Sequence, residues 1–311
     1  MNIHQYFDPK KTTELFGLQS YLFFFYELIL REKFPKVMLL SGEKGLGKST
    51  LTNHLMSLVF DNKNYDIKKN LINKNSIYYS QYLDNIFPNI INFTASNSKN
   101  ITIEDVRNLK NMLSKTPISF GKRFIIIDDV ETLNINCLNG LLNIIEKPKK
   151  NDNFILINNK SQPILETIKS RAIEIKIIMN EDQIEKVSSF LLNKFNQKII
   201  FDMNLIKCSP GNFLKYNYIF NQNKLNIDEK YTNTLKKILA LYKKEKDIFF
   251  RDILLFYSDY YLQKIRINKD LSNKKTITKR SLIFNNINDF FLYNLNQDTL
   301  IRSIENNVFY E

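Results

Sequence analysis

The amino-acid sequence predicts an α/β fold, in which a parallel sheet with helices on both faces is followed by a region built of helices alone. Short apolar runs alternate with segments of helical periodicity up to about residue 178, which is the pattern of repeated strand and helix units. From about residue 180 onward, the apolar residues recur only at helical spacing. A glycine-rich stretch after the first apolar run indicates that the sheet carries a phosphate-binding loop.

The first expected elements are a helix, a strand and a second helix. Residues 12–33 have the spacing of an amphipathic helix, and residues 37–40 form the short apolar run of a buried parallel strand. Beyond the glycine-rich stretch, apolar residues recur at helical intervals from Leu51. Residues 61–75 are rich in Asn and Lys and have no period, which predicts a solvated loop.

Further apolar runs supply the remaining strands of the sheet. The expected strands are residues 90–93, 124–127, 154–157 and 172–178, and the expected helices between them begin at Thr102 and cover residues 138–145. The second of these strands ends in two carboxylates, and the third ends in two asparagines. Polar side chains at these positions would meet at one edge of the sheet, because all strands of a parallel sheet end on the same side.

The composition excludes several classes of protein. The chain has 311 residues, 43% of them hydrophobic, which is enough for two or three domains with buried cores. Two cysteines, Cys137 and Cys208, are too few for a disulfide framework or a four-Cys zinc site, and His4 and His54 do not fill that gap. We therefore expect a reducing cytoplasm. The apolar stretch at residues 21–30 is shorter than the roughly twenty residues that span a bilayer, so no membrane association is expected.

The formal net charge of +13 comes mainly from lysine, with 37 Lys and 8 Arg against 32 acidic residues. Residues 264–280 are especially rich in lysine. We interpret this segment as a solvated surface, with a contact to nucleic-acid phosphates as the alternative. Such a contact would be sensitive to salt and indifferent to base sequence.

Residues 42–49 satisfy the pattern GxxxxGK(S/T) between a predicted strand and a predicted helix, which is the context that this motif requires. Gly45 and Gly47 let backbone N–H groups converge on a β-phosphate. Lys48 is expected to place its ammonium between the β- and γ-phosphates, and Ser49 to offer its hydroxyl to Mg²⁺. The sequence therefore predicts that this glycine-rich loop binds ATP or ADP with Mg²⁺.

Two neighbouring carboxylates follow the strand at residues 124–127. Asp128 is expected to join Ser49 in holding Mg²⁺, through water. Asp129 stands where an ATPase of this type usually carries a glutamate that polarises the attacking water, and it is one methylene shorter. A misplacement of about 1 Å costs on the order of a hundredfold in rate, so Asp129 is a weak catalytic candidate and ATPase activity of the chain alone is expected to be weak or absent. The alternative for Asp129 is a helix N-cap.

Five segments, taken in order, resemble the clamp-loader branch of the AAA+ ATPases. They are residues 15–17, 42–50 (GEKGLGKST), 125–134 (IIIDDVETLN), 139–148 and 167–172. The resemblance is specific over residues 15–178 and thins after residue 223. It implies an AAA+ P-loop domain at residues 1–178, a small helical lid at residues 179–223 and an all-helical collar that oligomerises at residues 224–311.

Within this branch, two segments are similar to the delta-prime subunits of bacterial DNA polymerase III. One is residues 101–109, followed by Thr116-Pro117, and the other is Ser209-Pro210-Gly211. Cys208 and Asn212 replace the first glycine and the arginine of the delta-prime pattern, and no arginine stands where motor subunits carry the residue that senses the γ-phosphate. The resemblance implies a nucleotide-binding, weakly hydrolysing subunit of the complex that loads the sliding clamp onto primed DNA. The alternative is a hydrolysing clamp-loader motor or another DNA-linked AAA+ ATPase.

The resemblance also assigns roles to two residues in the second half of the AAA+ region. Arg171 takes the place of the arginine finger that acts in trans on a neighbouring subunit, with a surface ion pair to a nearby acid such as Glu166 or Glu174 as the alternative. Asn158 takes the place of a polar residue that faces the nucleotide, and it is alternatively an ordinary strand-ending asparagine. The full set of predicted nucleotide-binding residues is Gly42, Glu43, Lys44, Gly45, Leu46, Gly47, Lys48, Ser49, Thr50, Asp128 and Asn158.

Many members of the family carry a four-Cys zinc module directly after the helix of the glycine-rich loop. The corresponding residues 61–74 contain no cysteine, so no zinc is expected. The partners that the resemblance implies are the motor and delta-like subunits of the clamp loader, and the sliding clamp and primed DNA through the complex.

Overall fold

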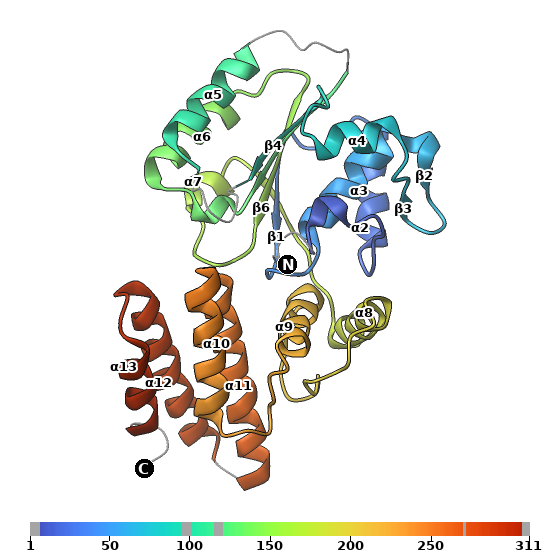
Figure 1. Ribbon diagram of the computed structural model, residues 1–311. Helices are drawn as coiled ribbons and strands as arrows, with labels where there is room; N and C mark the ends of the chain where they lie inside the picture. Colours follow the sequence, from blue (N-terminus) through green and yellow to red (C-terminus); the bar gives the residue numbers. More distant parts are fainter. Residues whose placement is uncertain (1–6, 95–100, 115–120, 270–271, 307–311) are drawn as a thin grey trace. The chain divides into compact units, whose positions relative to one another are not determined.

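The computed structural model describes residues 7–94, 101–114, 121–269 and 272–306 (Figure 1). The chain divides into two compact units. The first comprises Met1–Val187 with Ser209–Gly211, and the second comprises Ser188–Cys208 with Asn212–Glu311. His4 and Thr116-Pro117, which the sequence analysis mentions, lie outside the described residues.

A five-stranded parallel sheet forms the centre of the first unit, and its strand order is β4-β5-β6-β1-β7. Its strands are β1 (Val37–Ser41), β4 (Ile90–Thr94), β5 (Arg123–Asp128), β6 (Asp152–Asn158) and β7 (Ile173–Lys176). β1 pairs with β6 on one side and with β7 on the other. Because the pairing is parallel throughout, the carboxyl ends of all strands lie at one edge of the sheet. The predicted parallel sheet is confirmed.

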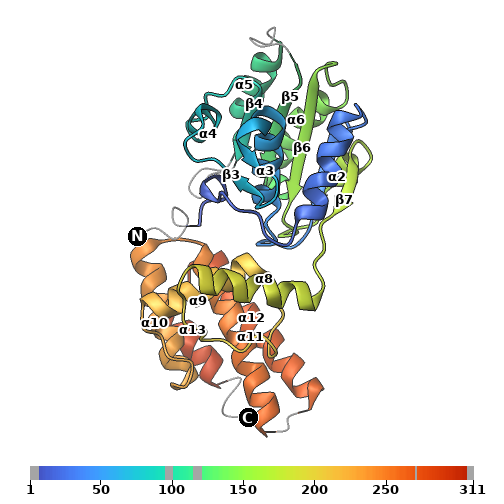
Figure 2. The ribbon, with the colours of Figure 1, turned by 90° about the vertical axis from the view of Figure 1, so that its right-hand side faces the viewer.

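Helices cover both faces of this sheet. They are α2 (Gln19–Leu30), α3 (Lys48–Phe60), α4 (Ile77–Leu83), α5 (Ile103–Ser114), α6 (Ile135–Ile145) and α7 (Glu166–Lys169). Met38 and Leu40 of β1 pack into the cluster of α2 and α3, whereas Val37 and Leu39 pack into the cluster of α5 and α6. Successive side chains of a strand point to opposite faces, so a continuously apolar strand serves both layers. Figure 2 shows α2 and α3 in front of the strands.

Local capping explains where α5 begins. The Thr102 hydroxyl accepts a hydrogen bond from the Asp105 backbone N–H at 3.3 Å, and the Asp105 carboxylate accepts one from the Thr102 backbone N–H at 2.8 Å. This reciprocal pair satisfies two backbone donors that have no partner within the helix. The predicted helix start at Thr102 is therefore confirmed.

Two of the predicted elements differ from the structure. The first helix begins at Gln19 rather than at residue 12. Residues 61–75 are not a solvated loop, because they contain a short antiparallel pair of strands, β2 (Tyr65–Asp66) and β3 (Leu71–Ile72). Each strand has only two residues, which is too short to produce an alternating pattern in the sequence. One residue of each strand is buried, namely Tyr65 and Ile72.

A buried histidine anchors the helix that follows the glycine-rich loop. His54 of α3 is fully buried; its Nδ1 lies 2.9 Å from the Tyr65 hydroxyl and its Nε2 lies 3.3 Å from the Thr12 carbonyl oxygen. The carbonyl only accepts, so Nε2 carries the proton and Nδ1 accepts from the tyrosine. Burial lowers the pKa of His54 to about 4 from its ordinary value of 6.5, against the opposing effect of the Thr12 carbonyl.

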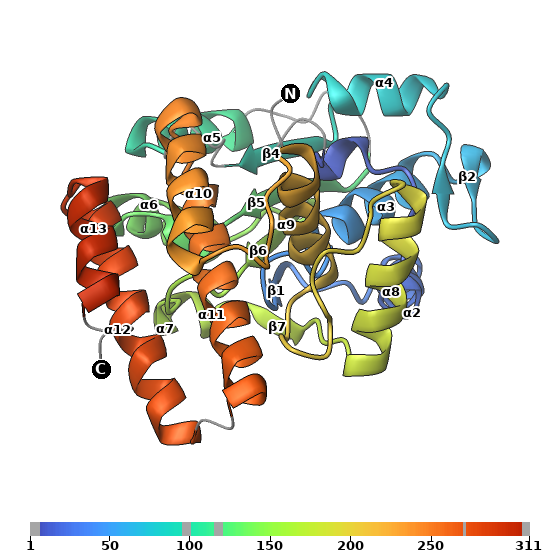
Figure 3. The same ribbon diagram turned by 60° about the horizontal axis from the view of Figure 1, so that its bottom comes forward.

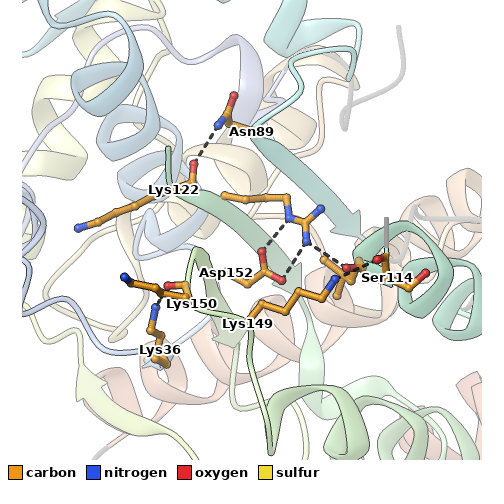
Figure 4. A network of polar contacts seen from close by, with 9 residues as sticks. Lys36, Asn89, Ser114, Lys122, Lys149, Lys150 and Asp152 are labelled. Carbon is orange, nitrogen blue, oxygen red and sulfur yellow. Dashed lines mark hydrogen bonds and ion pairs between the residues drawn. The ribbon is translucent and has the colours of Figure 1, made fainter. Parts of the chain in front are cut away.

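At the amino edge of the sheet, a buried ion pair joins β5 to β6. Arg123 Nε donates to Asp152 Oδ1 at 2.8 Å, and Arg123 Nη2 donates to Asp152 Oδ2 at 2.9 Å, with side chains only 5% and 3% exposed. Figure 4 shows the Asp152 carboxylate among other contacts that tie the same edge together. The further contacts are Asn89 to the Lys122 carbonyl, Lys149 to the Ser114 carbonyl and Lys36 to the Lys150 carbonyl.

Aromatic side chains fill the core of the second unit. The helices of this unit are the end of α8 (Glu181–Lys194), most of α9 (Pro210–Gln222), and α10 (Tyr231–Glu245), α11 (Phe249–Lys269), α12 (Asn273–Leu292) and α13 (Gln297–Ile304). Phe201 packs edge-on against Phe220 of α9 at 4.7 Å and against Phe256 of α11 at 4.9 Å between ring centroids. Figure 3 shows α10 to α13 gathered as one helical group.

The second unit thus combines helices from the predicted lid and the predicted collar. The division into residues 1–178, 179–223 and 224–311 remains a prediction, because α9 and α11 share the aromatic core. None of the helices within the described residues is long and apolar enough to cross a membrane.

The lysine-rich segment at residues 264–280 covers the end of α11 and the beginning of α12. Lys264 pairs with Asp228 at 2.6 Å, and Arg280 pairs with Asp259 at 2.8 Å. The Arg280 guanidinium also lies 4.4 Å from the ring centroid of Phe284. These contacts at both ends of the segment agree with its interpretation as a solvated surface with local ion pairs.

Removing the arginine of the buried ion pair is expected to destabilise the first unit strongly. Arg123→Leu leaves the Asp152 carboxylate buried without a partner, which typically costs about 3 to 5 kcal/mol. Urea unfolding followed by circular dichroism measures the change. Arg31→Leu is the control, because Arg31 pairs with Glu27 at 2.6 Å on the surface, where such a pair contributes about 0 to 1 kcal/mol. Equal losses in the two variants would contradict the prediction.

The buried histidine is expected to make folding sensitive to acid. The pKa of His54 is lower in the folded chain than in the unfolded chain, so the unfolded chain binds more protons between about pH 4 and pH 6.5. The free energy of unfolding therefore falls as the pH falls through this range, by up to about 1.4 kcal/mol per pH unit. His54→Gln should flatten this dependence. Nuclear magnetic resonance of the histidine rings measures the pKa directly, and a His54 pKa near 6.5 would refute the prediction.

Candidate nucleotide-binding site

The glycine-rich loop joins β1 to α3 at the carboxyl edge of the sheet. Residues 42–47 form the loop, and Lys48, Ser49 and Thr50 open α3. Gly45 and Gly47 have φ angles of 89° and 90°, in the left-handed region that glycine adopts without a steric penalty. The loop can therefore turn sharply before the amino end of a helix, where free backbone N–H groups and the helix dipole favour an anion.

The lysine of the motif lies back over the loop. Lys48 is 2% exposed, and its Nζ donates to the carbonyl oxygens of Gly42 at 2.7 Å and Glu43 at 2.8 Å. Burial lowers the pKa of Lys48 to about 8, and Asp128 is the largest of the nearby carboxylates that oppose this shift. A phosphate arriving at the loop would oppose it further, so the charged ammonium is the form that a polyphosphate stabilises.

A hydroxyl and a carboxylate meet directly beside the loop. Ser49 Oγ donates to Asp128 Oδ2 at 2.5 Å, although 79 residues separate them in the sequence. The Asp129 backbone N–H donates to Asp128 Oδ1 at 2.9 Å. Burial raises the pKa of Asp128, Asp129 raises it further, and the two hydrogen bonds lower it. Oxygen atoms of this kind suit Mg²⁺, so the donor set fits the predicted metal.

Among the described residues, no three His, Cys, Asp or Glu side chains gather into a metal-binding group. A magnesium ion at Ser49 and Asp128 would take its other ligands from nucleotide phosphates and water, which is how Mg²⁺ is usually bound with nucleotides. The expectation that the chain holds no zinc stays a prediction.

The two asparagines at the end of β6 have different surroundings. Asn158 is buried, its Nδ2 donates to Ser41 Oγ at 3.3 Å, and its Oδ1 accepts from the Lys160 backbone N–H at 2.9 Å. These contacts fasten β6 to β1 and shape the turn that follows. The role of Asn158 toward a nucleotide stays a prediction, and its contacts are those of a residue that ends a strand.

The next residue reaches the acidic pair. Asn159 Nδ2 donates to Asp128 Oδ1 at 3.1 Å and to Asp129 Oδ1 at 2.7 Å. Sequence reasoning singled out Asn158 and missed Asn159. The signal for Asn159 is weak, since two consecutive asparagines end the strand and only the turn geometry decides which one faces the carboxylates.

A third acid supports the same region. Glu131 is 6% exposed, and its Oε1 accepts hydrogen bonds from the Asn159 backbone N–H at 3.0 Å and the Ser161 hydroxyl at 2.8 Å. It therefore holds the turn after β6 against the segment after β5. Sequence analysis did not assign a role to Glu131, because an acid three residues past the strand has no distinctive pattern.

Asp129 takes the position of an N-cap without making the capping contact. It precedes a short 3-10 helix, Val130–Thr132, with a φ of 55°, and its side chain accepts no hydrogen bond from that helix. Its Oδ1 accepts from Asn159 instead. Asp129 therefore occupies the N-cap position, as the alternative interpretation predicts, but its carboxylate does not cap the helix.

Arg171 lies away from the glycine-rich loop of its own chain. It lies two residues before the edge strand β7, at the amino edge of the parallel sheet, whereas the loop lies at the carboxyl edge. Its Nη2 lies 3.4 Å from Glu146 Oε1, and its Nη1 donates to the Thr167 carbonyl at 3.1 Å. Arg171 thus makes the surface ion pair of the alternative interpretation, but its partner is Glu146 of α6. Of the two acids named as examples, Glu166 pairs with Lys169 at 2.8 Å instead.

Comparison with known proteins gives a family match for about half of the chain. The model of a family described as DNA polymerase III, delta subunit, matches residues 19–181. A DNA polymerase III subunit delta' from Buchnera aphidicola subsp. Baizongia pistaciae is 31% identical over 112 residues, or 35% of this chain and 33% of that protein. A DNA polymerase III subunit gamma from Buchnera aphidicola subsp. Schizaphis graminum is 26% identical over 164 residues, or 52% of this chain and 44% of that protein.

The matched regions span less than half the length of either curated relative. Among solved structures, a gamma-subunit-related protein of DNA polymerase III from Thermotoga maritima covers 91% of this chain and 96% of its own, at 13% identity and a TM-score of 0.49. The strand order of the sheet, and not this similarity, defines the fold.

Proposed function

Since the chain belongs to the DNA polymerase III delta-subunit family, in the clamp-loader branch of the AAA+ proteins, we propose that it binds ATP or ADP with Mg²⁺. Its proposed role is that of a delta-prime-like subunit in the complex that loads the sliding clamp onto primed DNA. The proposed partners are the motor and delta-like subunits, with the clamp and primed DNA reached through the complex. The proposed location is the cytoplasm.

The observation that carries nucleotide binding is the contact of Ser49 Oγ with Asp128 Oδ2 at 2.5 Å, beside the buried Lys48. In this proposal the loop N–H groups hold the phosphates, and Lys48 neutralises the charge between the β- and γ-phosphates. The hydroxyl and the carboxylate then orient Mg²⁺, which polarises the phosphate oxygens when it is bound.

Weak hydrolysis is the second part of the proposal. Asp129 has a shorter side chain than glutamate, and its Oδ1 is engaged by Asn159 at 2.7 Å. A carboxylate held this way is poorly placed to orient an attacking water, and positioning errors of about 1 Å cost on the order of a hundredfold. No arginine stands where motor subunits carry the residue that senses the γ-phosphate, so one source of transition-state stabilisation is missing.

The alternative function is a hydrolysing motor, and the match to a gamma subunit over 52% of the chain favours keeping it. The two functions differ in steady-state phosphate release by the purified chain. Sustained release that primed DNA stimulates would favour the motor, and the absence of turnover would favour the assembly subunit.

We further propose that Arg171 acts on the nucleotide of a neighbouring subunit. Its position at the sheet edge opposite to its own loop supports a role in trans. The surface pair with Glu146 at 3.4 Å, with side chains 36% and 52% exposed, is weak enough to exchange for a phosphate partner. A guanidinium presents planar, permanently charged donors that lysine does not reproduce.

The helices after residue 224 are proposed to assemble with the other subunits. Several apolar side chains on these helices and in the connection between α12 and α13 are exposed. They are Ile267 (60%), Ile277 (66%), Leu292 (73%), Tyr293 (66%) and Leu295 (40%). Scattered exposed apolar residues are common on monomers, so this supports the proposal only together with the family membership.

Replacing the loop lysine is expected to abolish nucleotide binding. Lys48→Met keeps the apolar stem in its buried position and removes the charge that faces the phosphates, so the affinity for a fluorescent ATP or ADP analogue with Mg²⁺ should fall by more than a hundredfold, or roughly 3 kcal/mol. Titration measures the affinity. Lys63→Met, an exposed lysine outside the site, is the control and should bind normally. Equal affinities for Lys48→Met and the wild-type chain would refute nucleotide binding at this loop.

Removing the proposed finger is expected to affect only the assembled complex. Arg171→Ala should leave nucleotide affinity and assembly unchanged and should lower the DNA- and clamp-stimulated ATPase of the reconstituted clamp loader. Arginine fingers contribute about 10³ to 10⁵ in rate. The loss of ATPase rate in the whole complex should be smaller, because only one of its several nucleotide sites would depend on Arg171. Lys169→Ala, which removes a neighbouring surface charge, is the matched control. ATPase and clamp loading at the wild-type level in the Arg171 variant would return this residue to a surface ion pair.

A further inference from the structure

We propose that Ser209 and the first two residues of α9, Pro210 and Gly211, hold the glycine-rich loop in the conformation that binds a nucleoside di- or triphosphate. We call residues 209–211 the anchoring turn, because they include the beginning of the first turn of α9. Ser209 is the positioning residue of this device, because it touches the loop and not the phosphates. The proposal rests on the proposed function of nucleotide binding, and it adds residues from a distant part of the sequence to that site.

Two hydrogen bonds connect the anchoring turn to the loop. Ser209 is 3% exposed, and its Oγ donates to the Lys44 carbonyl oxygen at 2.5 Å. The Gly211 backbone N–H donates to the Gly45 carbonyl oxygen at 3.0 Å. Both residues of each contact belong to the first compact unit, because residues 209–211 are part of that unit although the residues before and after them belong to the second.

The approach of the two backbones is close enough to exclude a side chain. A Cβ atom at Gly211 would lie 2.7 Å from the Gly45 carbonyl oxygen, which is well inside van der Waals contact. Pro210, between the two contacting residues, fixes its own φ angle and limits the freedom of the turn. The turn is therefore shaped to lie against the loop backbone.

Peptide geometry links these carbonyl contacts to the phosphate side of the loop. In a trans peptide the C=O and the following N–H lie in one plane and point in opposite directions. The Lys44 carbonyl shares its peptide with the Gly45 N–H, and the Gly45 carbonyl shares its peptide with the Leu46 N–H. Fixing the two carbonyls therefore aims the two N–H groups away from the turn. In this structure the Leu46 N–H donates to the Glu43 carbonyl oxygen at 3.4 Å, a long hydrogen bond that a phosphate would have to replace.

Without the anchoring turn, these peptides have unusual freedom. Gly45 has a φ of 89°, and glycine also populates many other conformations at little cost. A loop that samples several conformations must be ordered when the phosphates bind, and that ordering reduces the affinity. The two hydrogen bonds bring about this order before the ligand arrives.

The chemistry of the anchoring turn determines which ligands it affects. It brings no charged side chain to the loop, in contrast to an arginine that would sense a γ-phosphate. Backbone N–H groups of a phosphate loop cradle the phosphates that ADP and ATP share. Loss of the anchor should therefore weaken both nucleotides by the same factor.

The test uses the full chain and compares four variants with the wild type. Ser209→Ala removes the hydroxyl, and Gly211→Ala pushes the turn off the loop. Ser209→Thr keeps the hydroxyl and should restore binding. Ser80→Ala, at an exposed position of α4, is the matched control for the serine substitution.

Fluorescent ADP and ATP are titrated into each variant with Mg²⁺. We expect Ser209→Ala to weaken both nucleotides about fivefold, as for loss of one hydrogen bond, and Gly211→Ala to weaken both at least as much. Ser209→Thr and Ser80→Ala should bind like the wild type. Wild-type affinity in Ser209→Ala, or a loss confined to ATP, would overturn the proposal.

Amide hydrogen exchange separates this proposal from the proposed function. In the chain without nucleotide, the Gly45 and Leu46 amides should exchange faster in Ser209→Ala than in the wild type, with Ser209→Thr restoring the slow rate. If the wild-type chain bound neither nucleotide, the proposed function would fail and the exchange rates alone would decide the anchoring. Unchanged exchange at both amides would overturn it.

Discussion

The parallel pairing of β1 with β6 is the constraint on which the candidate site depends. It sets Ser41 opposite Asn158, so that both strands end at the same level. The glycine-rich loop leaves β1 at that edge, and the turn that carries Asn159 leaves β6 beside it. β5, paired on the other side of β6, ends there with Asp128. A slip of one residue in the pairing would exchange the side chains that face the two helical layers and would separate these groups.

Much of this architecture is readable in the sequence because its strands are buried on both faces. Continuous apolar runs such as residues 124–127 and 154–157 have few alternatives, and the motif at residues 42–49 fixes the loop between a strand and a helix. Residues 61–75 were misread for the opposite reason. Their two strands have two residues each, and their stability comes from tertiary contacts such as that of Tyr65 with His54 at 2.9 Å, which no local pattern reveals.

The residues of the candidate site also differ in whether local sequence patterns or only tertiary contacts reveal them. Lys48, Ser49 and Asp128 are marked by motif and strand ends, and the structure brings them together. Asn159, Glu131 and Ser209 were not predicted as site residues, because each acts through contacts that depend on how a turn folds back. Arg171 shows a third case, since its ion-pair partner Glu146 comes from a different helix than the nearby acids that the sequence offers.

The backbone contact between Gly45 and Gly211 makes two distant stretches of the sequence interdependent. A Cβ atom at Gly211 would lie 2.7 Å from the Gly45 carbonyl oxygen, so a side chain at this position requires the loop to retreat. The same holds for protein engineering. A phosphate loop transplanted from this chain into another scaffold would leave behind the residues that fix its carbonyls, and it would carry over the motif without the conformation. The unit to transplant is the loop together with the turn.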